Sequence, residues 1–407
     1  MPVVPVSDDL YVAELFHGPT FAFKGKVYSL IYFNSSLDLA LQFVGNMCDY
    51  FLEKRKLKTT ILVATSGDTG SAALQAVKGK NSIECFVLYP KGRISEFQEN
   101  QMTTIQGNNI HVLCVEDSTS DDLDDILKLL FDDVDFNKQH NLCSINSINW
   151  ARIMIQMVHY FWSYFRVRDS LIKNKNIENV VDFWPEFNFS VPTGAFGNSF
   201  AGILTKKMGL PISRIVVATN ENDILNRFLT NGIFSRGSVV KTLSPSIDIQ
   251  VPYNFERLLY YLSEEQSPQV REWMLQFKET GSLDLSNLLS KAKEYLLSES
   301  INDKETTLII KQYFTENNYL LDPHSAVGVA AALKLKNVLN NLPLICLATA
   351  HACKFADAMK EAVGFEPVPP HTIEDMSNLK KYHKEITKKD AEETLRKMVH
   401  EYYLKKE

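Results

Sequence analysis

Two short loops combine glycine with hydroxyl side chains and are the first candidates for ligand binding. Residues 65–71 read TSGDTGS, and residues 192–198 read PTGAFGN. Each loop follows an apolar run and precedes a stretch of helical periodicity, so its backbone N–H groups lie at a helix N-terminus, where an anion is stabilised. The shared G-x-x-G spacing also lets a phosphate approach the backbone without meeting a Cβ. The two loops therefore predict that the chain binds two anionic groups.

A tight structural turn is the alternative explanation for either loop taken alone. That explanation is less favoured when two loops share the same flanking pattern. Neither loop matches the G-x-x-x-x-G-K-[ST] or G-x-G-x-x-G patterns of nucleotide-binding proteins. The loop sequences therefore do not indicate that the predicted anions belong to a nucleotide.

Lys24 is a candidate nucleophile, because it follows a turn and a cluster of aromatic residues in the sequence FHGPTFAFK. Apolar surroundings disfavour the charged form of an amine and leave it nucleophilic near neutral pH. A surface lysine whose aliphatic carbons pack on its neighbours is the alternative. Thr349 and His351 follow another apolar run, where α/β proteins place ligands. His351 taken alone is more simply explained as a structural histidine.

Composition excludes several classes of partner and site. Hydrophobic residues make up 45% of the 407 residues, which is typical of a globular protein with a large core. The formal net charge of −6 provides no basic excess to attract nucleic acid. The apolar stretches fall short of the roughly 18 residues that a membrane span needs. The six cysteines form no C-x-x-C pair, and the acids at 121–125 follow helix-capping residues, so we predict neither disulfides nor a metal site.

Six apolar runs are expected to form the strands that position these loops. They are rich in β-branched residues and lack polar alternation, which is typical of strands covered on both faces by helices. We therefore expect an α/β protein with mainly parallel sheets. The runs are residues 60–64, 84–89, 110–115, 187–191, 215–219 and 344–348.

Three parts are expected along the chain. The polar stretch 173–179 interrupts the pattern and predicts a boundary between an N-terminal α/β part, residues 1–170, and a C-terminal α/β part, residues 171–365. From about Tyr382, charged residues surround a single apolar stripe. Residues 366–407 are therefore expected to form a charged, solvent-exposed helical tail.

Seven segments resemble the fungal type of threonine synthase, and they occur in the same order. The resemblance runs from about Glu14 to Phe355 and is therefore specific. It implies a fold type II enzyme with two α/β domains, an active site between them, and pyridoxal 5′-phosphate (PLP) as cofactor. The segments are residues 14–20 (ELFHGPT), 64–73 (ATSGDTGSAA), 101–104 (QMTT), 146–152 (NSINWAR), 218–225 (ATNENDIL), 322–328 (DPHSAVG) and 354–358 (KFADA).

The resemblance implies a role for each candidate residue. Members of the family convert O-phosphohomoserine and water into threonine and phosphate. Lys24 matches the Schiff-base lysine, and Thr349 matches the hydroxyl that bonds the pyridine nitrogen of PLP. The loop that binds the cofactor phosphate is matched by Gly194, Ala195, Phe196, Gly197 and Asn198. The loop that binds the substrate anion is matched by Ser66, Gly67, Asp68, Thr69 and Gly70.

The chain departs from the family pattern in three places. Residues 25–37 separate Lys24 from Asp38, whereas the family has the aspartate directly after the lysine, so we interpret them as an unspliced intron or a mistaken gene model. Little sequence precedes the ELFHGPT segment, and the N-terminal region is expected to be truncated. Ala195 and Asn198 replace an asparagine and an aspartate, a change that keeps the backbone N–H donors.

The predicted function is that of a cytoplasmic threonine synthase, a monomer or homodimer that acts on a small molecule without metal, nucleic acid or membrane. Two alternatives stay open. A related phospho-lyase would release 2-oxobutyrate and ammonia. A chain inactivated by residues 25–37 and by the missing N-terminal region would be a PLP-binding or interaction protein. Product analysis with O-phosphohomoserine distinguishes these functions.

Overall fold

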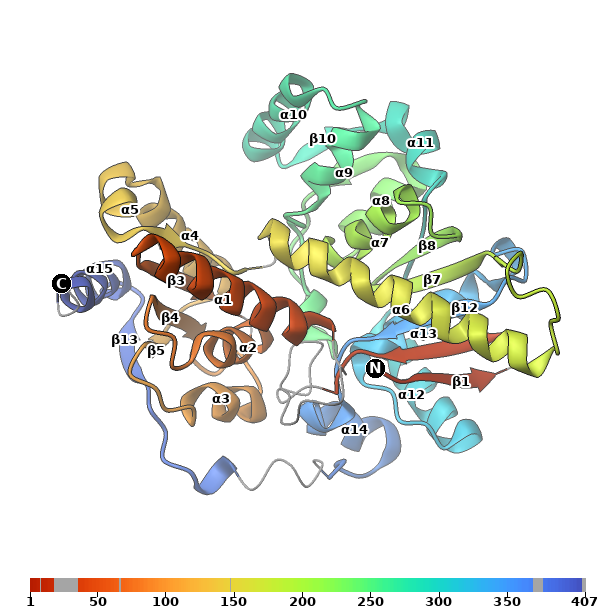
Figure 1. Cartoon of the computed structure of the whole chain (residues 1–407), viewed down its shortest axis with the longest axis horizontal. Helices are drawn as coiled ribbons and strands as arrows, with labels where there is room; N and C mark the ends of the chain where they lie inside the picture. The colour runs from red at the N-terminus through yellow and green to blue at the C-terminus, as the bar shows by residue number, and fades with distance from the viewer. Residues whose placement is uncertain (8, 18–35, 66, 147, 369–375, 405–407) are drawn as a thin grey trace. The chain divides into compact units, whose positions relative to one another are not determined.

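Figure 1 shows the computed structural model of the chain, which describes residues 1–7, 9–17, 36–65, 67–146, 148–368 and 376–404. The chain divides by its contacts into two units. The first contains Met1–His17 and Ile153–Pro367, and the second contains Gly18–Arg152 and Val368–Glu407. Both units are discontinuous, because the chain leaves the first after His17 and leaves the second after Arg152.

The first unit is built on a six-stranded sheet with the order β1-β2-β12-β7-β8-β11. β1 and β2 are antiparallel, and the other neighbouring pairs are parallel. Parallel neighbours require crossover connections, which helices supply here. The strands are β1 (Val3–Ser7), β2 (Leu10–Glu14), β7 (Phe187–Pro192), β8 (Ile212–Thr219), β11 (Leu296–Ser300) and β12 (Leu344–Ala348).

Helices cover both faces of this sheet, which explains why β7 and β8 are apolar along most of their length. On one face lies α6 (Trp150–Asn174), whose Tyr160 ring centroid is 4.9 Å from that of Phe189 in β7. On the other face lies α13 (Pro323–Lys334), whose alanine and valine side chains share a buried core with β8 and β12.

Shorter elements complete the first unit. Its other helices are α7 (Gly197–Lys207), α8 (Ile224–Asn231), α9 (Phe255–Leu262), α10 (Ser267–Thr280), α11 (Leu289–Lys293), α12 (Asp303–Asn317) and α14 (Ala356–Val363). Single 3₁₀ turns occur at η1 (Pro245–Ile247), η2 (Ser286–Leu288), η3 (Lys336–Val338) and η4 (Ala352–Lys354). An antiparallel pair is formed by β9 (Ile233–Ser235) and β10 (Ser282–Asp284).

The second unit contains a five-stranded sheet with the order β13-β5-β4-β3-β6, in which neighbouring strands are parallel. Helices α1, α2 and α3 share a core with one face, and α4 and α15 share a core with the other. The strands are β3 (Thr59–Ala64), β4 (Ile83–Pro90), β5 (Ile110–Glu116), β6 (Leu142–Cys143) and β13 (Lys384–Thr387). The helices are α1 (Ser36–Arg55), α2 (Asp68–Val77), α3 (Glu96–Thr103), α4 (Ser120–Asp132), α5 (Val134–His140), η5 (Met376–Asn378) and α15 (Ala391–Leu404).

The predicted class, α/β with mainly parallel sheets, is confirmed. Each of the six apolar runs lies within a strand, namely β3, β4, β5, β7, β8 or β12. The sequence analysis missed the other described strands, among them β2, β11 and β13. Of these, β11 and β13 lie at sheet edges, where only one side is paired and polar residues are tolerated.

The C-terminal segment contains the expected helix, but the expectation that it is a solvent-exposed tail is wrong. Residues 384–387 form β13, which pairs in parallel with β5. The helix α15 follows, and its apolar stripe, including Leu395 and Val399, is buried against α4 and the sheet. The apolar stripe was the signal for this packing, because a stripe of that kind needs a surface to cover it.

The two units also differ from the boundaries expected near residues 170 and 365. Residues 1–17 belong with the later part of the chain because β2 pairs with β12. Residues 368–407 belong with the earlier part because β13 pairs with β5. The polar stretch 173–179 lies inside the first unit, at the end of α6 and in the connection to β7.

Candidate active site

The five residues predicted to bind the cofactor phosphate, 194–198, span the loop after β7 and the first two positions of α7. β7 ends at Pro192 and α7 begins at Gly197, so the loop turns directly into a helix N-terminus. Phe196 is the N-cap residue and has φ 66°, in the left-handed region that side chains rarely adopt. Its buried ring lies edge-on to Phe255, with centroids 6.0 Å apart. This packing holds the turn in a conformation that the backbone alone disfavours.

Gly194 has no space for a side chain. An added Cβ would lie 2.9 Å from Ile249 Cδ1, 3.0 Å from Ile247 Cα and 3.2 Å from the Ser246 carbonyl oxygen. The loop therefore packs backbone against backbone on the segment that contains η1. The adjacent carbonyl of Ala195 accepts hydrogen bonds from the Asn254 backbone N–H and the Asn254 side-chain Nδ2, each at 3.1 Å.

Asn198 provides a buried donor at this helix N-terminus. Its Oδ1 lies 2.9 Å from His159 Nε2, and its Nδ2 is buried with no hydrogen-bond partner among the described residues. Burial lowers the pKa of His159 to about 3, although the bond with Asn198 opposes this shift. The imidazole is therefore neutral and donates its Nε2–H to Oδ1, which directs the Asn198 amide N–H groups elsewhere.

This loop fits the phosphate of a PLP cofactor. The first turn of α7, which is fully described, contains no acidic residue. The N–H groups at the start of a helix have no acceptor within the helix, and the helix dipole favours an anion there. Together with the Asn198 amide, these groups form a set of donors suited to the three acceptor oxygens of a phosphate.

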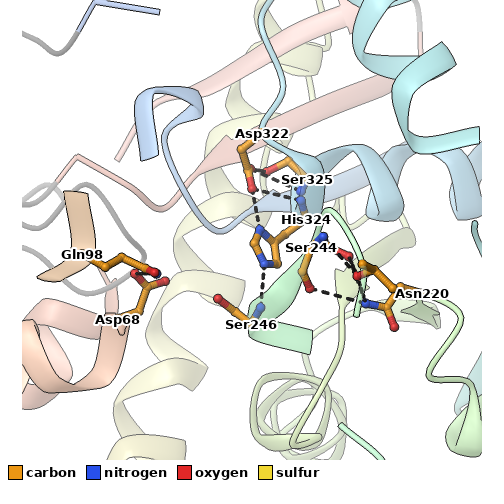
Figure 2. Close-up of polar contacts among 9 residues, drawn as sticks. Asp68, Gln98, Asn220, Ser244, Ser246, Asp322, His324 and Ser325 are labelled. Carbon is orange, nitrogen blue, oxygen red and sulfur yellow. Dashed lines mark hydrogen bonds and ion pairs between the residues drawn. The ribbon is translucent and has the colours of Figure 1, made fainter. Parts of the chain in front are cut away.

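The loop between β3 and α2 contains the residues predicted to bind the substrate anion, of which Ser66 lies outside the described residues. Here the loop supplies its own acceptors, because Thr65 Oγ1 accepts the N–H groups of Gly67 at 3.0 Å and Gly70 at 2.9 Å. Asp68 is buried at the first position of α2 and accepts a hydrogen bond from Gln98 Nε2 at 3.0 Å (Figure 2). The helix N-terminus therefore already holds a carboxylate.

Gln98 supports this loop and was missed by the sequence analysis. It lies in α3, where its Oε1 accepts the Ser95 N–H at 3.1 Å as part of a capping box. Gly67 has φ 122°, and an added Cβ would lie 2.5 Å from Gln98 Cδ. The sequence S-x-x-Q at 95–98 is a capping signature that predicts the helix start, but not the contact with the loop.

Thr349 lies in the first unit, directly after β12 and half-buried. β12 and β7 are parallel neighbours, so Thr349 and the loop 194–198 follow strand ends at the same edge of the sheet. His351 is the N-cap of η4, where its Nδ1 accepts the Cys353 N–H at 3.2 Å. Burial lowers its pKa, so His351 is neutral at neutral pH, as expected of a structural histidine.

A second group of polar residues lies at the carboxyl end of β2, next to β12 in the sheet. Tyr319 donates a hydrogen bond to Glu14 Oε1 at 2.8 Å, and His17 Nε2 lies 2.5 Å from Glu14 Oε2. Burial opposes ionisation of Glu14, but the bonds with His17 and Tyr319 lower its pKa overall. Lys354 is buried nearby in η4. Sequence reasoning gave these residues no role beyond the family resemblance.

Some predicted site residues are brought together and others are not described. The loop 194–198 and Thr349 share one sheet edge, and the loop that contains Asp68 belongs to the second unit. Lys24 lies outside the described residues. Within the described ranges, no cluster of three or more His, Cys, Asp or Glu side chains could hold a metal ion. The helices in the same ranges are too short or too polar to cross a membrane.

The chain is similar in sequence to threonine synthases. The family model described as "Threonine synthase, C-terminal" matches residues 325–399. Threonine synthase of Saccharomyces cerevisiae is 40% identical over 417 aligned residues, covering 95% of this chain and 76% of the yeast protein. Threonine synthase-like 2 of Rattus norvegicus is 43% identical over 372 residues, covering 90% of this chain and 72% of the rat protein.

A solved structure gives the same result. The crystal structure of PLP-bound threonine synthase from Brucella melitensis superposes with a TM-score of 0.84 at 38% identity, covering 97% of this chain and 80% of that chain. Sequence identity and fold therefore agree along most of the chain, and the fold type II architecture is confirmed. The chain belongs to the threonine synthase family.

Proposed function

We propose that this chain is a PLP-dependent threonine synthase that converts O-phosphohomoserine and water into L-threonine and phosphate. The observation that carries the proposal is the loop after β7, which in a member of this family combines a helix N-terminus free of acidic residues with the buried Asn198 amide. A biosynthetic role in the cytoplasm remains a prediction.

The bound cofactor would supply an electron sink at its pyridine ring. Residues 194–198 would hold its phosphate, and the Thr349 hydroxyl would contact the ring nitrogen. Lys24 is proposed as the residue that joins the cofactor and, as the free amine, takes and returns protons at the α- and β-carbons of the substrate. Its role rests on the family resemblance, because Lys24 lies outside the described residues.

Residues 66–70 would bind an anionic group of the substrate at the N-terminus of α2. Two N–H groups of this loop already bind Thr65, and Asp68 already occupies the helix end. The loop therefore has fewer donors to offer than the loop after β7. A substrate held by its anionic group loses freedom of motion, which contributes to the rate when the reacting groups are aligned.

The test is product analysis of the full chain, reconstituted with PLP and supplied with O-phosphohomoserine. We expect threonine and phosphate in equal amounts. Release of 2-oxobutyrate and ammonia would assign a phospho-lyase activity instead, and no phosphate release would indicate an inactive chain. Lys24→Ala is the control, and it should reduce the rate by at least about a hundredfold.

A second version of the chain, lacking residues 25–37, tests the interpretation of that segment. The deletion restores the family order, with Asp38 directly after Lys24. We expect the shortened chain to be about a hundredfold more active, because a displacement of about 1 Å at a reacting group costs that much. Equal activity of the two versions, measured at the same PLP occupancy, would contradict the intron interpretation.

A further inference from the structure

We propose that Asp322 and His324 are positioning residues that hold the phosphate loop, residues 194–198, through the backbone of Ser246. This inference rests on the proposed function, in which that loop binds the cofactor phosphate. Both side chains are buried in the first unit, at the N-terminus of α13. Figure 2 shows the His324 ring between Asp322 and Ser246.

The hydrogen bonds define the tautomer of His324. The Ser246 N–H donates to Nε2 at 3.1 Å, so Nε2 carries no proton. Nδ1 lies 2.9 Å from Asp322 Oδ1 and therefore carries the proton that it donates to the carboxylate. The same carboxylate caps α13, because it accepts the N–H groups of His324 at 3.0 Å and Ser325 at 3.3 Å. The imidazole orientation is thus fixed by a helix cap.

His324 is a positioning residue and not a catalytic one, because both of its ring nitrogens are engaged inside the protein. Its side chain is 3% exposed and that of Asp322 is 0% exposed. The ring also packs against Phe355, with centroids 4.9 Å apart. A proton exchanged with a substrate would require one of these bonds to break.

Ser246 connects the histidine to the loop. It lies in η1 with Ile247, and these two backbones approach Gly194 so closely that an added Cβ there would lie 3.2 Å from the Ser246 oxygen and 3.0 Å from Ile247 Cα. The Ile249 side chain closes the same contact, because its Cδ1 would lie 2.9 Å from that Cβ. A shift of η1 would therefore move or release Gly194 and the N–H groups that follow it.

The segment around η1 is held independently at its ends. Asp248 Oδ1 accepts hydrogen bonds from Thr242 Oγ1 at 2.6 Å and from Asn220 Nδ2 at 2.7 Å. Asn220 Nδ2 also lies 3.0 Å from Ser244 Oγ. The bond to His324 lies between these contacts, at the point where the segment meets the loop. The hydrogen bond with His324 therefore positions the middle of the segment, whereas the other hydrogen bonds hold its two ends.

The experiment compares two substitutions in the full chain. His324→Leu removes the acceptor for Ser246, whereas His324→Gln keeps an acceptor oxygen at the same distance along the side chain. We expect PLP to bind about tenfold more weakly to His324→Leu, as for one lost buried hydrogen bond. His324→Gln should recover affinity to within about threefold of the parent. PLP affinity is measured by absorbance titration.

Hydrogen–deuterium exchange of the peptide that contains residues 194–198 gives a readout independent of activity. We expect faster exchange there in His324→Leu, in the absence of PLP, and near-parent exchange in His324→Gln. The matched control is His111→Leu, which breaks another histidine–carboxylate pair, His111 Nε2 to Glu84 Oε1 at 2.5 Å, in the second unit. That control should change neither the exchange of the loop nor the PLP affinity.

The outcomes separate this inference from the proposed function. Unchanged loop exchange and PLP affinity in His324→Leu would overturn the inference, as would equal losses in the leucine and glutamine variants. If His324→Leu does not fold, Asp322→Asn replaces it, because it keeps one acceptor oxygen but loses the charge that orients the ring. If the parent chain binds no PLP, the proposed function fails, and loop exchange alone decides the positioning role.

Discussion

The two glycine loops share a sequence pattern and a place in the fold, yet they use their N–H groups in opposite ways. In the loop between β3 and α2, Thr65 accepts two of the loop N–H groups and Asp68 places a carboxylate at the helix end. In the loop between β7 and α7, the helix end has no acidic residue and Asn198 adds a buried amide donor. In the loop after β3, hydrogen bonds within the protein already occupy two N–H groups. In the loop after β7, the buried Asn198 amide is available to a ligand.

This difference indicates which loop suits a phosphate. A phosphate with nearly two negative charges is best stabilised where donors converge without a competing anion. The loop after β7 meets that condition, and its conformation is set from outside by Phe255 and by the η1 segment. An anion at the loop after β3 must share the end of α2 with Asp68. Glycine spacing alone therefore does not determine the ligand.

The largest expected effect comes from adding a methyl group to one loop or the other. Gly194→Ala places a Cβ 3.0 Å from the Ile247 backbone and should weaken PLP binding by about ten- to hundredfold. Gly67→Ala meets Gln98 at a φ of 122° and should raise the KM for O-phosphohomoserine by a similar factor, with PLP affinity unchanged. Absorbance titration and steady-state kinetics measure the two quantities.

Gly209→Ala is the control for backbone strain alone, because Gly209 has φ 101° and open space around the position of a Cβ. It should affect stability but neither ligand. If Gly194→Ala and Gly67→Ala impaired both ligands equally, the assignment of one ligand to each loop would be wrong.

The second expected effect is a pH dependence of stability to which the loop after β7 contributes through His159. Burial lowers the pKa of His159 to about 3, from 6.5, so the unfolded chain binds a proton between these values that the folded chain does not. The free energy of unfolding therefore falls as the pH decreases from about 6.5. The change is about 1.4 kcal/mol per pH unit, so the free energy of unfolding at pH 5 is roughly 2 kcal/mol lower than at pH 6.5.

His159→Gln keeps a donor for Asn198 but does not titrate, so its urea unfolding should lose less stability between pH 7 and pH 5 than the parent does. Gly209→Ala, at a position with open space around the added Cβ, alters no titratable group and should leave the pH dependence as in the parent. Identical pH dependence in the parent and His159→Gln would contradict the prediction.

The smallest expected effect concerns the charge at α2. Asp68→Asn removes the carboxylate but keeps an oxygen that can accept the bond from Gln98. Inorganic phosphate should then compete with O-phosphohomoserine about two- to fivefold more strongly, as expected for one charge at a helix end. Asp68→Glu keeps the charge and should show no such gain. An unchanged inhibition constant in Asp68→Asn would mean that this loop does not receive the substrate anion.

Much of the fold could be predicted because its signals are local. Strands such as β4 and β7 are buried at every position because helices cover both faces of their sheets, so apolar residues predominate in them and make them recognisable. β13 has a single buried residue, Ile386, and only its pairing with β5 makes it a strand. The buried stripe of α15 was visible, but its partner surface is distant in sequence.

The candidate site likewise contains features that could be predicted from the sequence and features that could not. Both loops were found from glycine spacing, because the turn from strand to helix is a local requirement. The groups that hold them were not found, because Gln98 contacts Asp68 from another helix and His324 contacts Ser246 from an element much later in the chain. The catalytic role of Lys24 remains a prediction from the resemblance.

The interleaved units have a consequence for how the protein is made. β2 lies between β1 and β12 in its sheet, and the ribosome synthesises β12 only after the intervening residues that form most of the second unit. At typical elongation rates the delay is on the order of half a minute. The second sheet in turn receives β13 only after most of the first unit has been made. Each sheet therefore lacks one of its strands until most of the other unit has been synthesised, and its apolar strand edges stay exposed for that time. Such edges favour aggregation, so we expect chaperones to assist the folding of the nascent chain.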